Sequence, residues 1–354
     1  MSRLTDASSI GQVPEQRPDR PHVVLVMSQA TWAELITPAL AGRLQAAAEV
    51  DLETVLQDFG QPGARPALHA AHILLTGWGA PRIDTDALDL MPALRAIVHA
   101  AGTVKTFLSP QVYRRGIQVS SAVEANAIPV AEFTFAAIVF AAKRVGAFAG
   151  EYRARRDLSA RQTPSLAARA GTNGITVGVV GASRVGCRLL RLLRNLDVRV
   201  LVSDPYLSEA DATALGASLT GLDELVAGSD IVTLHAPALP ETARMIDRDR
   251  LAALADGAVL INTARGALVD TDALTAELAS GRISAVLDVT DPEPLPPDSP
   301  LYELPNVQLT PHIAGSVGNE VPRLLEYAIA EIERLAAGLP LRFPVLAGDL
   351  PRMA

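Results

Sequence analysis

The chain has 354 residues, of which 49% are hydrophobic and 20% charged, and this length suits a globular protein of about two domains. Its 31 basic and 39 acidic side chains give a formal net charge of −8, which argues against nucleic acid or an anionic membrane surface as the main partner. The single cysteine, Cys187, excludes an internal disulfide and favours a reducing compartment. We therefore expect a cytoplasmic protein.

The first expected elements follow a polar, proline-bearing stretch, residues 1–20, which we interpret as a flexible tail. Short apolar runs then alternate with helical stretches, and the runs predict strands at residues 22–27, 50–56, 71–78, 94–101 and 117–121. Such alternation predicts a parallel sheet with helices on both faces.

A long helix is expected next, from about Pro129 to Gly150, because the fixed φ of proline suits a first helical turn. Its apolar part, residues 133–142, is about half the length that spans a bilayer, so we interpret it as a buried helix. The arginine-rich residues 151–173 have no clear pattern. They fit either an arm that packs on a second subunit or a solvated loop.

A second series of strands and helices starts at Ile175. Further strands are expected at residues 200–203, 231–234, 258–262, 285–289 and 307–309, and a last helix at about 318–337. This last helix can return to the first unit. The pattern therefore predicts one domain built from both chain ends and one continuous inserted domain.

The inserted domain opens on a glycine-rich turn typical of dinucleotide binding. Gly181 and Gly186 match the outer glycines of the fingerprint, but Ser183 replaces the middle one. Asp204 ends the next strand, where a carboxylate can accept the ribose hydroxyls of NAD and would repel the 2′-phosphate of NADP. Ser183 can cap the helix that starts at Arg184 and can offer its hydroxyl to the pyrophosphate, and we expect both.

Three polar residues, Arg265, Glu293 and His312, each follow a short apolar run of the second series. Since ligands gather at the carboxyl ends of parallel strands, we expect the three to converge on one crevice. A guanidinium can grip a substrate carboxylate, an imidazole can give and take a proton near neutrality, and a carboxylate can hold that imidazole in one tautomer. The trio therefore predicts proton transfer beside a bound carboxylate.

Three segments resemble the signature segments of the NAD-dependent D-isomer-specific 2-hydroxyacid dehydrogenases: Asn262-Thr-Ala-Arg265-Gly-Ala-Leu-Val-Asp270, Leu287-Asp-Val-Thr-Asp-Pro-Glu293-Pro-Leu295 and Leu309-Thr-Pro-His312-Ile-Ala-Gly315. This family includes phosphoglycerate, glycerate and D-lactate dehydrogenases. The resemblance implies an α/β fold with two Rossmann-like, doubly wound parallel-sheet domains and a cleft between them. It implies a substrate domain at residues 21–125 and 315–354, an NAD-binding domain at 126–314, a 2-hydroxy or 2-keto acid as substrate, and a homodimer.

The resemblance also implies roles at matching positions. Arg265 would bind the substrate carboxylate, His312 would be the general acid/base, and Glu293 would be its partner. Cofactor contacts would come from Gly181, Ser183, Arg184, Val185, Gly186, Asp204, His235, Pro237, Thr263, Ala264, Asp288 and Gly315. Substrate would meet the loop that holds Ala101, Gly102, Thr103 and Lys105.

Lys105 departs from the family pattern, which often has Asp or Asn there. It can bind a second anionic group of the substrate, or it can be a solvated lysine at the rim. His69 and His72 have no nearby acidic ligand, so no metal site is expected.

Two other functions remain open. One is an NAD(H)-sensing binding module that resembles the C-terminal-binding corepressors, and the other is an enzyme that uses S-adenosylmethionine. The second leaves Arg265 and His312 unexplained. The sequence identifies neither the acid nor the physiological direction.

Overall fold

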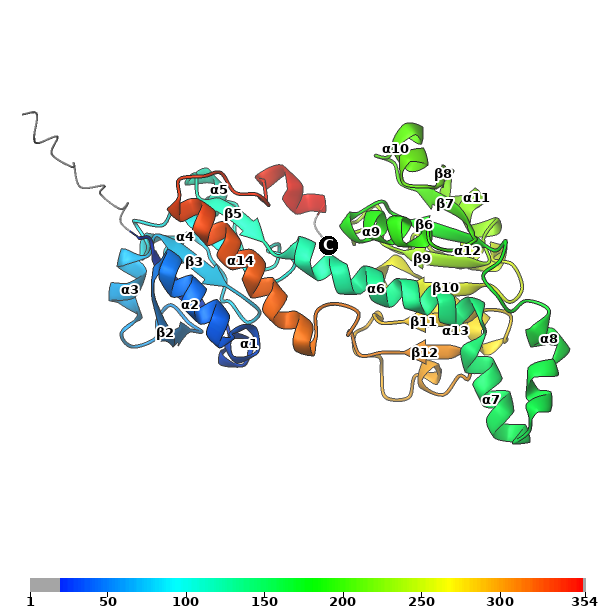
Figure 1. Cartoon of the computed structure of the whole chain (residues 1–354). Helices are drawn as coiled ribbons and strands as arrows, with labels where there is room; N and C mark the ends of the chain where they lie inside the picture. Colours follow the sequence, from blue (N-terminus) through cyan, green and yellow to red (C-terminus); the bar gives the residue numbers. More distant parts are fainter. Residues whose placement is uncertain (1–19, 353–354) are drawn as a thin grey trace, which may run out of the picture.

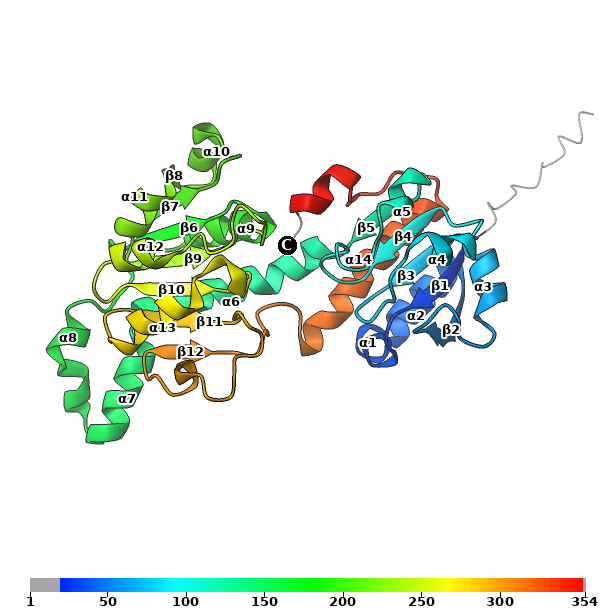
Figure 2. The same ribbon diagram turned by 180° about the vertical axis from the view of Figure 1, so that it is seen from behind.

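The structure, a computed structural model, describes residues 20–352 of the chain. The expected tail lies outside the described residues, apart from Arg20. The described residues form two lobes, each with its own parallel sheet, and a long helix, α6 (Val123–Ala142), runs from one lobe along the other (Figures 1 and 2). The expected α/β fold with two doubly wound parallel sheets is confirmed.

The first lobe contains a five-stranded sheet in the order β2-β1-β3-β4-β5, and all neighbouring pairs are parallel. Its strands are β1 (His22–Val26), β2 (Glu49–Leu56), β3 (Ile73–Thr76), β4 (Ala96–His99) and β5 (Gln118–Ser121). All five lie where the apolar runs predict them, with ends that coincide or differ by one or two residues. The strand order reverses between β1 and β3, so the switch point of this sheet lies at the carboxyl ends of these two strands.

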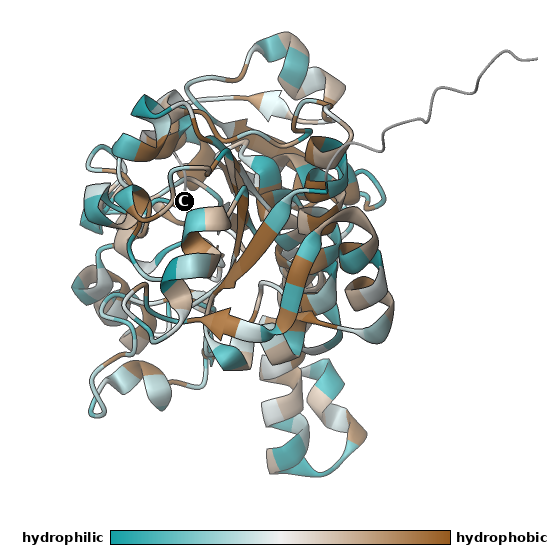
Figure 3. Ribbon diagram, turned by 90° about the vertical axis from the view of Figure 1, so that its left-hand side faces the viewer, coloured by the Kyte–Doolittle hydropathy of each residue, from teal (hydrophilic) through white to brown (hydrophobic). Residues whose placement is uncertain are grey.

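Two groups of helices cover the two faces of this sheet, because alternate strand residues point to opposite sides. One face packs on α1 (Gln29–Leu35), α2 (Pro38–Ala47) and α14 (Val321–Ala336). The other packs on α3 (Ala64–Ala70), α4 (Thr85–Asp89) and α5 (Gln111–Arg114). In Figure 3 the brown, hydrophobic residues gather on the strands and teal residues on the outer helices.

The second lobe contains a seven-stranded parallel sheet in the order β12-β11-β10-β9-β6-β7-β8. Its strands are β6 (Thr176–Val180), β7 (Arg199–Ser203), β8 (Ser218–Leu219), β9 (Ile231–Leu234), β10 (Val259–Asn262), β11 (Ser284–Leu287) and β12 (Val307–Leu309). The two-residue strand β8 is the one that sequence patterning missed, since it is too short to form an apolar run. The order reverses between β6 and β9, which is the position where doubly wound sheets bind dinucleotides.

Helices also cover both faces of the second sheet. On one face lie α6, α9 (Arg184–Leu193) and α10 (Glu209–Ala214). On the other lie α11 (Leu222–Ala227), α12 (Arg248–Ala253) and α13 (Thr271–Ala279). Short 3₁₀ helices occupy connecting segments: η2 (Gly266–Leu268), η3 (Pro300–Tyr302), η4 (Gly318–Glu320) and η5 (Ala347–Arg352).

Both ends of the described chain lie in the first lobe. Helix α14 packs on α2 and α1, and beyond it the backbone N–H of Val345 donates to the carbonyl oxygen of Val119 in β5 at 2.7 Å. The last helix therefore returns to the first unit, as its pattern predicts. The expected domain boundary at residue 126 falls inside α6.

The expected helix from Pro129 to Gly150 is wrong at both ends. Helix α6 begins at Val123 and contains Pro129 in its interior, because burial of its apolar side chains tolerates the loss of one backbone hydrogen bond. It stops at Ala142, and Arg144 adopts a left-handed φ of 56° before α7 (Val145–Arg155) begins. Helix α7, η1 (Leu158–Gln162) and α8 (Pro164–Ala167) form a projecting arm, visible in Figures 1 and 3.

Helix α6 is the one described helix that is long and apolar enough to cross a membrane, and 44% of its apolar window is buried. It packs along α9 of the second lobe. The arrangement is that of a core helix that links two lobes.

Candidate active site

The glycine-rich turn lies at the switch point between β6 and β9. Gly181 follows β6 with a φ of +97°, and a Cβ on it would lie 2.7 Å from the backbone nitrogen of Ala236. A Cβ on Gly186 would lie 2.1 Å from the carbonyl oxygen of Gly181. Neither position tolerates a side chain, so these glycines permit the tight turn and the close packing of α9 against it.

Ser183 caps helix α9, as expected. Its Oγ accepts a hydrogen bond from the backbone N–H of Gly186 at 3.3 Å. A serine hydroxyl that accepts in this way still has its own proton to donate. The cap is therefore compatible with the second expected role, a hydrogen bond to pyrophosphate, which stays a prediction.

Asp204 and Arg184 both lie at this turn, and both already have protein partners. The carboxylate of Asp204 accepts from the backbone N–H groups of Ala182, at 2.7 Å, and Tyr206, at 2.8 Å. Arg184 Nε lies 2.8 Å from Oε1 of Glu124 on α6. The turn is thus tied to the end of β7 on one side and to the helix between the lobes on the other.

A cavity of about 160 Å³ lies beside the turn and takes lining residues from both lobes. Among them are ten expected site residues: Gly102, Thr103, Ser183, Arg184, Val185, His235, Pro237, Thr263, Ala264 and Arg265. The Thr263 hydroxyl lies 2.9 Å from that of Thr134 on α6. The structure therefore brings most of the predicted cofactor residues to one hollow at the switch point.

His235 is the buried member of this set. Burial lowers the pKa of its imidazole to about 3, and its Nε2 lies 3.0 Å from the hydroxyl of Thr233. The ring is therefore neutral near pH 7 and fixed in place. It forms part of the wall and is unsuited to proton transfer.

Arg265 follows β10 and is partly buried. Its Nη1 donates to the carbonyl oxygen of Ala264 at 2.6 Å. Burial lowers the pKa of the guanidinium, while the nearby negative charge of Glu293 acts in the opposite direction. No ion pair involves Arg265 within residues 20–352, so a cation is held in a poorly solvated place, which favours an anionic ligand.

Glu293 and His312 are in direct contact. Oε1 of Glu293 lies 2.7 Å from Nδ1 of His312, and both side chains are about half exposed. They line a second cavity, of about 280 Å³, whose lining does not include Arg265. The structure thus pairs two members of the trio and keeps the third on the neighbouring cavity.

Asp288 supports the loop that carries His312. Its buried carboxylate accepts from the Thr310 hydroxyl at 2.7 Å and from the backbone N–H groups of Ile313 and Ala314 at 2.8 and 2.9 Å. Its carbonyl oxygen accepts from the N–H of His312 at 3.0 Å. Sequence reasoning expected Asp288 beside the nicotinamide, and it missed this loop contact because hydrogen bonds to backbone leave no sequence pattern.

Asn126 is another residue whose contact the sequence did not reveal. Its Oδ1 accepts from the backbone N–H of Ser316 at 2.9 Å, and a Cβ on Gly315 would lie 3.1 Å from the same oxygen. Asn126 also lines the cavity that Gly102 lines. It therefore connects α6 to the segment that leaves the second lobe.

The expected substrate loop enters the site only in part. Gly102 and Thr103 line the first cavity, whereas Ala101 is buried beneath them. Lys105 is exposed and lines neither cavity, and its backbone N–H donates to the Thr103 hydroxyl at 3.3 Å. No group of three or more His, Cys, Asp or Glu side chains in the described part of the chain has the geometry to hold a metal ion.

The residues around the switch point have the chemistry of a dinucleotide site. The two glycines permit the tight turn, Ser183 retains a donor, and Arg184 supplies a cation at the start of α9, where the helix N-terminus also favours a phosphate. Asp204 marks the carboxyl end of β7, the position of the adenosine ribose in such folds. The residues present therefore suit NAD.

Comparison with known proteins agrees with this geometry. Residues 135–314 match the family description "D-isomer specific 2-hydroxyacid dehydrogenase, NAD binding domain". The chain is 32% identical to a D-3-phosphoglycerate dehydrogenase of Archaeoglobus fulgidus over 74% of this chain and 49% of that protein. It is 33% identical to a glyoxylate reductase of Korarchaeum cryptofilum over 70% of this chain and 75% of that protein.

Among solved structures, the TT0316 protein of Thermus thermophilus is similar over 92% of this chain and 99% of its own, with a TM-score of 0.70 and 32% identity. The chain spans about half the length of the phosphoglycerate dehydrogenases that it matches.

Proposed function

The chain belongs to the family of D-isomer-specific 2-hydroxyacid dehydrogenases, which carry an NAD-binding domain, and from this membership we propose that it interconverts a D-2-hydroxy acid and the matching 2-keto acid with NAD(H). The contact that carries the proposal is the one between Glu293 and His312. The proposal is supported by the partly buried Arg265 on the neighbouring cavity, a cation without a carboxylate partner among residues 20–352.

Substrate binding starts from Arg265. A guanidinium donates two parallel hydrogen bonds to a carboxylate, and burial strengthens that attraction because water competes less. Backbone groups of Gly102 and Thr103, from the other lobe, line the same cavity. A 2-keto acid held in this way has its carbonyl carbon next to a fixed carboxylate, which limits the orientations open to it.

Proton transfer belongs to His312. Its Nδ1 is engaged by Glu293, so Nε2 is the nitrogen left to donate a proton to the substrate carbonyl oxygen, or to take one from the hydroxyl in the reverse direction. Glu293 fixes the tautomer and orientation that this exchange requires. NAD(H), when bound, supplies or accepts the hydride.

The relatives described above are named as dehydrogenases and reductases, which favours an enzyme over an NAD(H)-sensing binding module. We propose a small 2-keto acid as the substrate. The experiment is a screen of NADH oxidation, followed at 340 nm, with glyoxylate, hydroxypyruvate, phenylpyruvate and a phosphorylated keto acid. Turnover with any of them supports an enzyme. NADH binding without turnover across the whole screen contradicts the proposal.

The same screen tests Lys105. If Lys105 binds a second anionic group, Lys105→Ala raises KM for the phosphorylated keto acid and leaves KM for glyoxylate unchanged. If Lys105→Ala has wild-type kinetics on both substrates, Lys105 is a solvated residue at the rim.

We also propose a homodimer that uses the arm. Helix α7 has no buried residue, and four large apolar side chains are exposed on the arm and the end of α6: Phe140, Val145, Tyr152 and Leu158. Burial of such side chains is the usual driving force of subunit association. Tyr152→Glu with Leu158→Glu would yield a monomer by light scattering, and an unchanged dimer mass would exclude the arm as the contact.

A further inference from the structure

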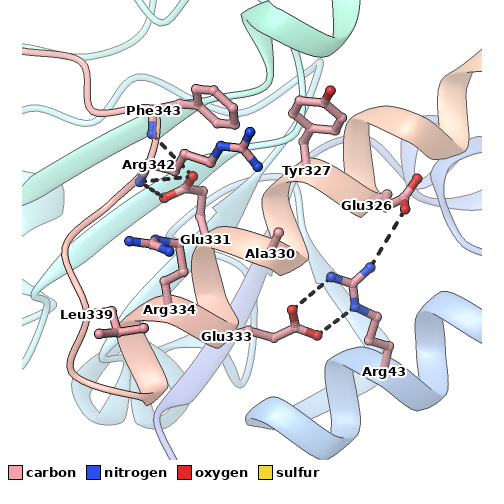
Figure 4. A pocket seen from close by; sticks show the side chains of 10 residues that line it. All are labelled: Arg43, Glu326, Tyr327, Ala330, Glu331, Glu333, Arg334, Leu339, Arg342 and Phe343. Carbon is pink, nitrogen blue, oxygen red and sulfur yellow. Dashed lines mark hydrogen bonds and ion pairs between the residues drawn. The ribbon is translucent and has the colours of Figure 1, made fainter.

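A cavity of about 450 Å³ lies on the first lobe, away from the cofactor turn, and it shares no lining residue with the two cavities described above (Figure 4). Its floor is the second half of α14, and one wall is the segment that follows α14. Arg43 of α2 closes the opposite side. Nothing in the proposed dehydrogenase chemistry uses this cavity.

The carboxylates that line the cavity already have hydrogen-bond or ion-pair partners within the protein. Arg43 makes two hydrogen bonds to Glu333, at 2.6 and 2.8 Å, and its Nη1 lies 3.9 Å from Oε1 of Glu326. Glu331 is buried, and its carboxylate accepts from the backbone N–H groups of Arg342 and Phe343. These carboxylates fix the walls.

The cationic side is different. Arg342 places its guanidinium carbon 5.0 Å from the ring centroid of Phe343, and Phe343 stacks on Tyr327 with centroids 5.6 Å apart. Arg334 uses only Nε, which donates to the carbonyl oxygen of Pro340 at 2.7 Å. No ion pair joins either guanidinium to a carboxylate of residues 20–352. Arg342 keeps its edge N–H groups free because it stacks on a ring, and Arg334 keeps its terminal N–H groups because only its Nε is engaged. Both can therefore donate to an anion.

We propose that this cavity is a second ligand site, one that binds a small monocarboxylate with an apolar body. The carboxylate accepts hydrogen bonds from Arg334 and Arg342. The apolar body packs on Tyr327 and on Leu339, whose side chain is half exposed at the edge of the cavity.

The charge of the ligand follows from the surroundings. Three glutamates line the cavity, and the carbonyl groups at the end of α14 carry partial negative charge. A dianion such as phosphate would meet this negative field, whereas a single negative charge can be matched by the two free guanidinium groups. A cation would be repelled by those guanidinium groups, and a neutral ligand would leave them unpaired.

The test uses benzoate as the probe, benzamide as its uncharged analogue and inorganic phosphate as the dianion, measured by isothermal titration calorimetry on the full chain. Because the substrate site also binds carboxylates, every titration is done in the Arg265→Gln protein as well as in the wild type. We expect benzoate to bind in both proteins, and benzamide and phosphate to bind at least about ten-fold more weakly, the loss expected for a missing charged hydrogen bond.

Two variants then locate the site. Arg334→Gln with Arg342→Gln is expected to weaken benzoate at least about ten-fold and to leave NADH-dependent keto acid reduction unchanged. Arg114→Gln, which replaces an exposed arginine of the same lobe that does not line this cavity, is the matched control and keeps wild-type affinity. Benzoate binding that disappears in Arg265→Gln, or that survives the double substitution in the Arg265→Gln background, overturns the proposal. Phosphate that binds more tightly than benzoate overturns the assigned ligand class.

Discussion

Asp288 offers the sharpest test of how the fold positions His312, the proposed acid/base. In Asp288→Ala the Thr310 hydroxyl and the N–H groups of Ile313 and Ala314 lose their acceptor. Each buried donor left without a partner costs about 1–3 kcal/mol. Ala314 is buried, whereas Ile313 is 38% exposed and its neighbourhood can admit water. We therefore expect a total loss of about 2–4 kcal/mol in the free energy of unfolding.

The assay is urea denaturation followed by circular dichroism, combined with keto acid turnover. The loop with His312 should shift in Asp288→Ala, so kcat should fall at least about ten-fold, because small displacements of a catalytic group are costly. Asp298→Ala, an exposed aspartate in the same segment, is the control and should change stability by less than about 0.5 kcal/mol. An Asp288→Ala protein with the wild-type midpoint and wild-type kcat would refute the reasoning.

Three further predictions concern the glycine-rich turn, His99, which is a buried histidine at the end of β4, and the contact between Glu293 and His312. Gly186→Ala places a methyl group 2.1 Å from the Gly181 carbonyl oxygen, so NADH should bind at least about ten-fold more weakly by fluorescence titration; an unchanged Kd would contradict this. Burial lowers the pKa of His99 to about 3. Between about pH 6.5 and that pKa the unfolded chain binds a proton at this histidine and the native state does not, so the free energy of unfolding decreases as pH falls through this range. His99→Phe should therefore reduce the slope of unfolding free energy between about pH 6 and 4 by about 1.4 kcal/mol per pH unit, and an identical slope would argue against it. Glu293→Gln should lower kcat and shift the acidic limb of its pH profile, whereas an unchanged profile would deny Glu293 its orienting role.

The strands and the contact between Glu293 and His312 were predictable because their signals are local. Apolar runs of four or five residues bounded by turns mark buried parallel strands, and the polar residues just beyond them lie at the carboxyl edge. Glu293 and His312 meet there at 2.7 Å. The cap formed by Ser183 was also predictable from the sequence, since serine is a preferred residue at the N-cap of a helix.

Other features depend on contacts that no local pattern encodes. Pro129 lies inside α6 because tertiary packing outweighs the helix penalty of proline. Strand β8 exists only through pairing with β7. The contacts of Asp288 and Asn126 join side chains to backbone groups 25 to 190 residues away. Arg265 is adjacent to the acid/base pair and lines a different cavity, a distinction that strand order alone does not make.

The central claim is that His312 delivers the proton while Arg265 holds the carboxylate, and a single-turnover experiment tests it most directly. Enzyme preloaded with NADH is mixed with the keto acid that performs best in the screen, and the absorbance at 340 nm is followed beside chiral analysis of the product. We predict one equivalent of NADH consumed and the D-hydroxy acid formed by the wild type, and no turnover by His312→Ala despite unchanged NADH binding. Full turnover by His312→Ala, or formation of the L-hydroxy acid, would contradict the account.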